Sequence, residues 1–79
     1  MKIIYYTKEG KFILDKNKTL PYYELHRLDG PAVIWPNGVK FYWINGKRLG
    51  TKEVECWIKN NKVNLKTKAG QIMFMLRFK

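Results

Sequence analysis

The chain has 79 residues, which leaves room for one domain over residues 1–79 and a small core, because a chain of this length buries only about 60–65% of its unfolded surface. Aromatic residues make up 15% of the chain and add enough apolar area to favour a folded domain over disorder. Sixteen Lys and Arg against six Asp and Glu give a net charge of +10, which favours an anionic partner, and the single cysteine excludes an intramolecular disulfide and a thiolate zinc cluster.

The first third of the chain predicts a β-hairpin followed by a loop. Residues 3–7 and 11–14 are rich in β-branched and aromatic residues, and they flank Lys8-Glu9-Gly10, a compact turn in which the glycine can take the left-handed conformation. Residues 15–21 are polar, end in a proline and have no apolar period, so they predict a loop that is free to meet a ligand. Residues 22–25 are expected to form a short strand before the next turn.

A second hairpin is predicted around Pro36-Asn37-Gly38. Asn-Gly between alternating residues favours a two-residue type I′ turn, because both central residues must adopt positive φ, which Asn and Gly do at little cost. In that register Trp35 faces Lys40 and Ile34 faces Phe41. The two predicted faces are Ala32, Ile34, Val39, Phe41 and Trp43 on one side, and Val33, Trp35, Lys40, Tyr42 and Ile44 on the other.

The second of these faces has two alternative fates. Either a following helix covers it, or it stays open as an aromatic-basic patch of Trp35, Lys40 and Tyr42. One amphipathic helix is predicted at about residues 52–60, where Val54 and Ile58 recur at helical spacing. Thr51 is expected to cap its start, and Asn60-Asn61 is expected to end it in the left-handed conformation.

The end of the chain predicts a strand. After a basic linker the apolar period becomes two from Gln71, which would place Ile72, Phe74, Leu76 and Phe78 on one side. The edge of such a strand could pair two chains into a homodimer. The predicted fold is therefore α+β: a small, mainly antiparallel β-sheet of hairpins with one packed helix and a C-terminal strand.

His26-Arg27-Leu28-Asp29-Gly30-Pro31-Ala32, followed by Pro36-Asn37-Gly38 and Trp43-Ile44-Asn45-Gly46-Lys47, resembles a repeat of small phage and bacterial proteins. That repeat reads His-Arg-x-Asp-Gly-Pro-Ala, a hairpin, then an aromatic residue and Asn-Gly-Lys, and each copy is a β-hairpin unit similar to a MORN-type repeat. Lys47-Arg48-Leu49-Gly50 lacks the His and Pro that would begin a second copy, so a solenoid is excluded. The resemblance implies a phage or prophage origin and a binding role, and it supplies no catalytic residues.

No catalytic constellation is evident in the sequence. With one His, one Cys and no telling pair of carboxylates, we expect a protein that is not an enzyme and that needs no metal or cofactor. His26 as a general base oriented by Asp29 is the one catalytic alternative, and a hydrogen-bonded turn histidine is the simpler reading. The apolar N-terminal run is too short for a signal peptide and no run approaches a membrane span, so a cytoplasmic protein is expected, in the host cell if phage-encoded.

The basic residues are concentrated near the end of the chain, because residues 56–79 carry six basic groups and no acidic one. Aromatic faces beside cations suit nucleic acid, since bases stack on rings while Lys and Arg hold phosphates. The predicted contacts are Trp35, Lys40, Tyr42, Lys47, Arg48, Lys59, Lys62, Lys66 and Lys68, with Arg77 and Lys79 at the edge.

The predicted function is therefore non-enzymatic binding of nucleic acid, or of a surface that binds nucleic acid. A rival hypothesis is an anti-defence or host-takeover inhibitor, which would dock by charge and shape on an acidic host protein such as a defence nuclease or a polymerase. A third is capture of a small anionic nucleotide signal.

Overall fold

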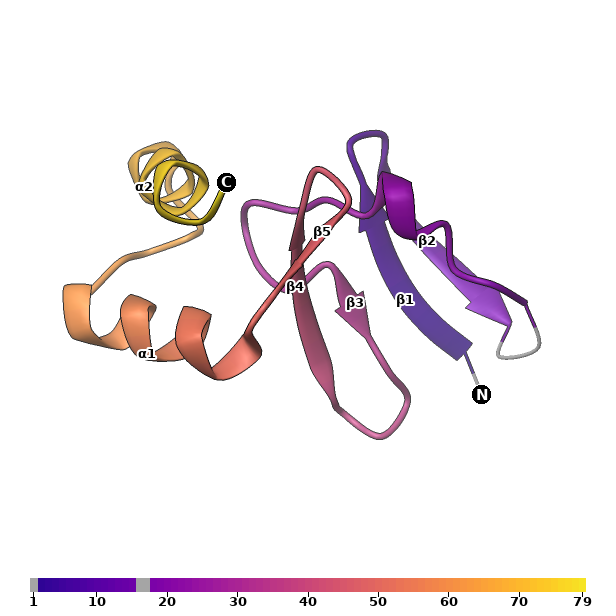
Figure 1. Ribbon diagram of the computed structural model, residues 1–79. Helices are drawn as coiled ribbons and strands as arrows, with labels where there is room; N and C mark the ends of the chain where they lie inside the picture. The colour runs from indigo at the N-terminus through magenta and orange to yellow at the C-terminus, as the bar shows by residue number, and fades with distance from the viewer. Residues whose placement is uncertain (1, 16–17) are drawn as a thin grey trace.

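The computed structural model describes residues 2–15 and 18–79, which form one five-stranded antiparallel sheet and two α-helices (Figure 1). The strands are β1 (Lys2–Thr7), β2 (Gly10–Asp15), β3 (Val33–Ile34), β4 (Lys40–Ile44) and β5 (Lys47–Leu49), in the order β2-β1-β3-β4-β5. The helices are α1 (Thr51–Asn61), α2 (Lys68–Phe78) and the short 3-10 helix η1 (Tyr22–Glu24). The predicted α+β class of hairpins with a packed helix is confirmed.

Strand β4 has an apolar core on each of its two faces. Tyr42 and Ile44 point to one side, where Val54 of α1 and Phe74 of α2 pack on them. Trp43 lies between them in the strand and therefore points to the other side, where it packs on a second buried cluster. That cluster consists of Ile3, Leu20, Leu25 and Val33. Figure 1 shows both helices beside β4 and β5, with β1 and β2 at the far end of the sheet.

The register of the β3–β4 hairpin is one residue away from the predicted one. Ile34 pairs with Lys40, and Pro36-Asn37-Gly38 forms a three-residue loop in which the N–H of Trp35 donates to the carbonyl of Val39 at 2.9 Å. The proline explains the difference, because its fixed φ suits the first central position of a type I turn. Only the glycine of this loop then has positive φ, at 90°. The predicted two-residue type I′ turn is therefore wrong at this place.

Because of the one-residue shift, the side chains of β3 share a face with a different set of β4 side chains than predicted. Val33, and no longer Ile34, lies beside Phe41. Tyr42 lies under the helices with 7% of its surface exposed, whereas Trp35 packs against the core on the opposite side. The indole Nε1 of Trp35 is buried and has no hydrogen-bond partner within the described chain. Trp35 and Tyr42 lie on opposite faces of the sheet, so they cannot form one patch with Lys40. The predicted open aromatic-basic patch is therefore absent, and the alternative of a face covered by a helix holds for Tyr42.

A type I′ turn does occur, at the second Asn-Gly of the chain. Asn45 and Gly46 have φ values of 51° and 79°, and they join β4 to β5, with Ile44 paired to Lys47. The sequence does not predict strand β5, because three residues are too few to display a period of two. The turn is tight and holds β5 against β4.

The C-terminal strand predicted from Gln71 is wrong, because residues 68–78 form helix α2. The side chain of Thr67 caps its start by accepting a hydrogen bond from the N–H of Gly70 at 3.0 Å. Phe74 and Phe78, four residues apart, are buried, whereas Leu76 is 63% exposed. A strand would have placed these three on one face. With no strand at this end of the chain, the dimer through a C-terminal strand has no edge to use.

Helix α1 covers the predicted range and extends it by one residue at each end. Gly50 rather than Thr51 is its N-cap, since the Thr51 hydroxyl donates instead to the carbonyl of Lys40 at 2.9 Å. Lys62, with φ of 52°, takes the left-handed position predicted for Asn60-Asn61. No helix among the described residues is long and apolar enough to cross a membrane.

The segment that leads into the signature motif is a 3-10 helix instead of the short strand predicted for residues 22–25. Pro21 precedes it, and the N–H of Glu24 donates to the proline carbonyl at 2.9 Å. Leu25 is fully buried and forms an isolated bridge with Thr7 of β1. Of the loop predicted for residues 15–21, residues 16 and 17 lie outside the described residues.

Candidate functional site

Residues 26–31, which we call the signature turn, are held against the Asn45-Gly46 turn. The N–H of Asn45 donates to Nδ1 of His26 at 3.0 Å, and the N–H of Gly46 donates to the carbonyl of Leu25 at 2.8 Å. A Cβ added to Gly46 would lie 2.6 Å from the carbonyl oxygen of Tyr23, so only glycine fits at this position. The motif residues of the two turns thus hold each other in place.

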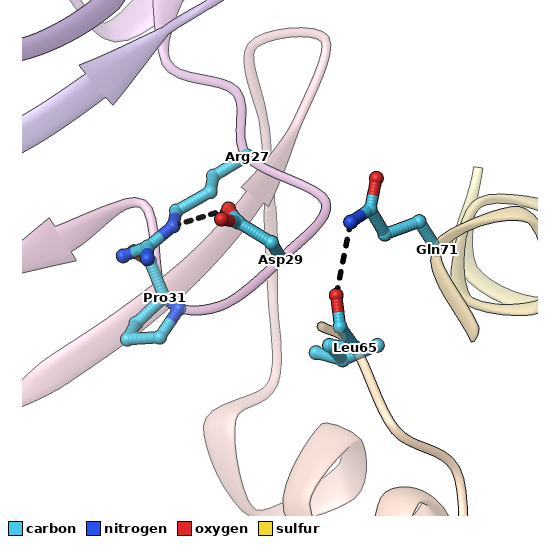
Figure 2. Close-up of polar contacts among 5 residues, drawn as sticks. All are labelled: Arg27, Asp29, Pro31, Leu65 and Gln71. Atoms are coloured by element: carbon cyan, nitrogen blue, oxygen red, sulfur yellow. Dashed lines mark hydrogen bonds and ion pairs between the residues drawn. The ribbon is translucent and has the colours of Figure 1, made fainter. Parts of the chain in front are cut away.

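Arg27 closes the signature turn from within. Its Nε donates to Oδ1 of Asp29 at 2.6 Å, which Figure 2 shows as a dashed line, and its Nη1 donates to the carbonyl of Pro31 at 2.9 Å. Its guanidinium also lies 3.8 Å from the centroid of the Tyr6 ring. The hydrogen bond from Arg27 lowers the pKa of Asp29 below its usual value. The planar fork of an arginine suits this set of partners, and a lysine would not.

The catalytic alternative required Asp29 to orient His26. The structure pairs Asp29 with Arg27, while His26 accepts from a backbone N–H, so the two residues do not form a base and its orienter. Burial, and next the charge of Lys8, lower the pKa of His26, which keeps the imidazole neutral near pH 7. Within residues 2–15 and 18–79, no cluster of His, Cys, Asp or Glu is arranged to hold a metal ion.

An open hollow of about 470 Å³ lies beside this pair of turns, and aromatic rings line part of it. Tyr5 and Phe12 stack on each other across β1 and β2 with centroids 5.4 Å apart. Tyr23 stands at the rim with 96% of its surface exposed. We call this the aromatic hollow; its polar lining residues are Thr7, Lys8, Glu9, Glu24, His26 and Asn45. Exposed rings beside carboxylates and amides can stack a flat ring and accept hydrogen bonds from its amino groups.

A second hollow, of about 260 Å³, gathers basic side chains from two parts of the chain. Lys47 and Arg48 come from β5, while Arg77 and Lys79 come from the end of α2; we call this the basic hollow. Glu53 of α1 also lines it and lies 3.8 Å from Arg77 in an exposed ion pair. Four cations against one carboxylate leave a net positive charge that can hold a phosphate.

The two hollows flank one turn, because Asn45 lines the aromatic hollow and Lys47, two residues later, lines the basic hollow. The structure therefore brings together four of the predicted contacts. These are Lys47 and Arg48, and also Arg77 and Lys79, which the sequence analysis placed at the edge of the site. The remaining predicted cations lie elsewhere. Lys40 begins β4, and Lys59 and Lys62 are at the end of α1, about 16 Å from its start. Lys66 lies in the connection to α2, and Lys68 is the first residue of that helix.

Sequence reasoning did not find the aromatic hollow. The sequence shows that Tyr5 and Tyr23 are present, but it does not show which way their rings point, because that depends on contacts with segments distant in the chain. The cross-strand pairing of Tyr5 with Phe12 follows from the first hairpin, which was predicted, and was the one available signal. The exposure of Tyr23 depends on η1, which was predicted as a strand.

Comparison of the chain with models of protein families, with curated proteins and with solved structures found no match in any of the three. The resemblance of the signature residues to a MORN-like hairpin repeat therefore stays a prediction. The geometry does give those residues a physical role, since Arg27 and Asp29 close the signature turn, and His26 and Gly46 join it to the Asn45-Gly46 turn.

We predict that Gly46→Ala destabilises the fold more than Gly38→Ala does. Both glycines have positive φ, which costs an alanine about 1–2 kcal/mol. A Cβ at Gly38 meets nothing within 4 Å, whereas at Gly46 it would force the Tyr23 backbone to move, at a further cost of about 1 kcal/mol or more. Urea denaturation of the two variants measures the difference, and equal midpoints would contradict the contact.

We predict that the free energy of unfolding falls as pH drops below about 6.5, the usual value for histidine. The pKa of His26 is lower in the folded chain, so the unfolded chain binds more protons there and acid favours unfolding; above pH 7 the effect is absent. Denaturation at pH 7.5 and 5.5 measures this. His26→Asn keeps an acceptor near the position of Nδ1 and should flatten the difference; an equally steep loss in this variant would assign it to another group.

Proposed function

We propose that the protein binds single-stranded nucleic acid without catalysing a reaction on it. The observation that carries the proposal is the gathering of Lys47, Arg48, Arg77 and Lys79 around one hollow. Two of the four cations come from β5, one from the last turn of α2 and one from the residue that follows it. The net charge of +10 adds a general attraction for polyanions.

The aromatic hollow supports a single strand over a duplex. Bases of a single strand are free to stack on side-chain rings, and the ring of Tyr23 is almost fully exposed. A strand crossing the turn at residues 45–47 would meet rings on one side and cations on the other. Glu9 and Glu24 in the aromatic hollow repel phosphates but accept hydrogen bonds from base amino groups, which favours a base at that place.

A second candidate function is docking on a protein, as an inhibitor of a host enzyme would. It is favoured by the outer face of α2, where Ile72, Met73 and Leu76 are 45%, 46% and 63% exposed. Capture of a partner from cell lysate with and without nuclease treatment separates the two functions. A protein that remains bound after nuclease digestion favours docking, whereas loss of every bound protein favours nucleic acid. The phage origin that the signature residues imply is compatible with both candidate functions and does not distinguish them.

We predict that the chain binds an oligodeoxycytidylate of about 20 nucleotides, whose bases carry amino groups, at low salt, and that affinity falls as salt rises. Lys47→Gln with Arg48→Gln should weaken binding and lower the slope of log affinity against log salt by about 1.4, since each phosphate contact contributes about 0.7 on single strands. Fluorescence anisotropy over a salt series measures both.

The matched control is Lys59→Gln with Lys62→Gln, which removes the same charge at the other end of α1. A smaller loss in this control assigns the binding to the basic hollow. Equal losses would mean that binding follows net charge alone, and no binding of the unaltered chain at low salt would end the proposal.

We predict that Tyr23→Ala weakens the same binding by about 5- to 100-fold, the usual effect of losing one stacked base. Because the side chain is 96% exposed, the variant should unfold at the same denaturant concentration as the unaltered chain. Tyr23→Phe keeps the ring and should restore affinity. Unchanged affinity in Tyr23→Ala would remove the aromatic hollow from the binding site.

A further inference from the structure

The two edges of the sheet are unlike each other. Strand β5 is three residues long, carries Lys47 and Arg48, and runs through Gly50 into α1. Strand β2 is six residues long, has neither proline nor bulge, and pairs with β1 along its whole length. Short, charged edges resist pairing with another chain, whereas long regular ones invite it. The β2 edge is therefore the open one, and among the described residues no strand pairs with its outer side.

The backbone groups that β2 offers to a partner can be identified. The N–H of Tyr6 donates to Ala32 at 2.8 Å and its carbonyl accepts from His26 at 3.0 Å, so the Tyr6 backbone faces away from β2. Its cross-strand partner Lys11 therefore sits in a non-hydrogen-bonded pair, with its own N–H and C=O on the outer side. Alternation gives Ile13 and Asp15 the same orientation, although the Asp15 carbonyl already accepts a hydrogen bond from the N–H of Lys18 at 3.0 Å.

These three residues form a self-complementary edge. If a second copy approaches antiparallel with Ile13 opposite Ile13, then Lys11 of each copy lies opposite Asp15 of the other. The central Ile13 pair can exchange two backbone hydrogen bonds. In each Lys11–Asp15 pair the N–H of Asp15 can donate to the Lys11 carbonyl, whereas the Asp15 carbonyl would accept from the N–H of Lys11 in addition to that of Lys18. Other registers that satisfy the same backbone groups oppose Lys11 to itself or to Ile13, or Asp15 to itself or to Ile13. Only the register centred on Ile13 matches the two charges. Within one chain Oδ1 of Asp15 lies 3.2 Å from Nζ of Lys2 in an exposed ion pair, so Lys11 of the second copy would share this carboxylate with Lys2.

The side chains agree with this register on both faces of the strand. Ile13, 62% exposed, would cover its counterpart on one face. On the other face Phe12, 39% exposed, would lie opposite Leu14, which extends the stacked pair of Tyr5 and Phe12 with an apolar neighbour. Pairing would thus remove from water the apolar side chains that β2 leaves open.

We propose that the chain forms a two-fold symmetric dimer through β2, with Ile13 on the axis and reciprocal ion pairs between Lys11 and Asp15. The partner is a second copy of this chain, because the hydrogen-bonding groups, the charges and the apolar side chains all match under the two-fold operation. The interface is small, so dimerisation is expected in the micromolar range. Moderate salt screens the repulsion between two chains of net charge +10 and leaves the backbone pairing intact.

The charge pairs give the sharpest test, measured by sedimentation velocity at moderate salt on protein freed of nucleic acid. The unaltered chain should pass from one chain mass to two as concentration rises. Lys11→Asp alone and Asp15→Lys alone should each stay monomeric, because each would oppose like charges twice. An equimolar mixture of the two variants should dimerise, since every opposed pair is then of opposite sign. Lys52→Asp, on the exposed surface of α1, lowers the net charge by the same amount as Lys11→Asp and should still dimerise.

Ile13→Pro tests the backbone pairing. The Ile13 N–H faces away from β1, so proline removes only the group offered to the partner and leaves the β1–β2 ladder in place. The variant should be monomeric and keep the thermal midpoint of the unaltered monomer. A single-chain mass of the unaltered protein up to about 1 mM would overturn the dimer. If Ile13→Pro still dimerises, the interface does not run through β2. If the unaltered chain dimerises but the mixture of the two charge variants stays monomeric, the register centred on Ile13 is wrong.

Discussion

Two turns from different parts of the chain meet at Gly46, and the rest of the fold depends on that contact. Because Gly46 has no side chain, the Tyr23 carbonyl can occupy the space that a Cβ at this position would need. Backbone hydrogen bonds from Asn45 and Gly46 then reach His26 and Leu25. Because Leu25 is fully buried and bridges to β1, this contact ties the β4–β5 turn to the first hairpin across the width of the sheet.

The same contact positions the surfaces that carry the proposed function. Tyr23 is held at the rim of the aromatic hollow by its backbone, which leaves its ring exposed. Lys47 and Arg48 follow the Gly46 turn and are thereby placed beside the end of α2. The signature residues hold these segments together, and they place rings on one side of a single turn and cations on the other.

The first hairpin and α1 could be predicted from the sequence because local signals agree there. A polar turn with Gly10 separates two β-rich runs, and Val54 with Ile58 marks an apolar helix face. The last eleven helical residues could not, because residues 72–76 are apolar at every position and have no period of their own. The capping hydroxyl of Thr67 and the buried pair Phe74 and Phe78 decide for a helix.

The sequence by itself determined the α+β class, the first hairpin, helix α1 and the strong positive charge. These depend on local backbone preferences and on composition, which a short window contains. The position of β2 at the edge of the sheet came from the tertiary structure. Only the tertiary structure decided the β3–β4 register, and with it the burial of Tyr42 and the separation of Trp35 from Lys40. A strand that is apolar on both faces does not specify which side each helix or loop will cover, so packing makes that choice.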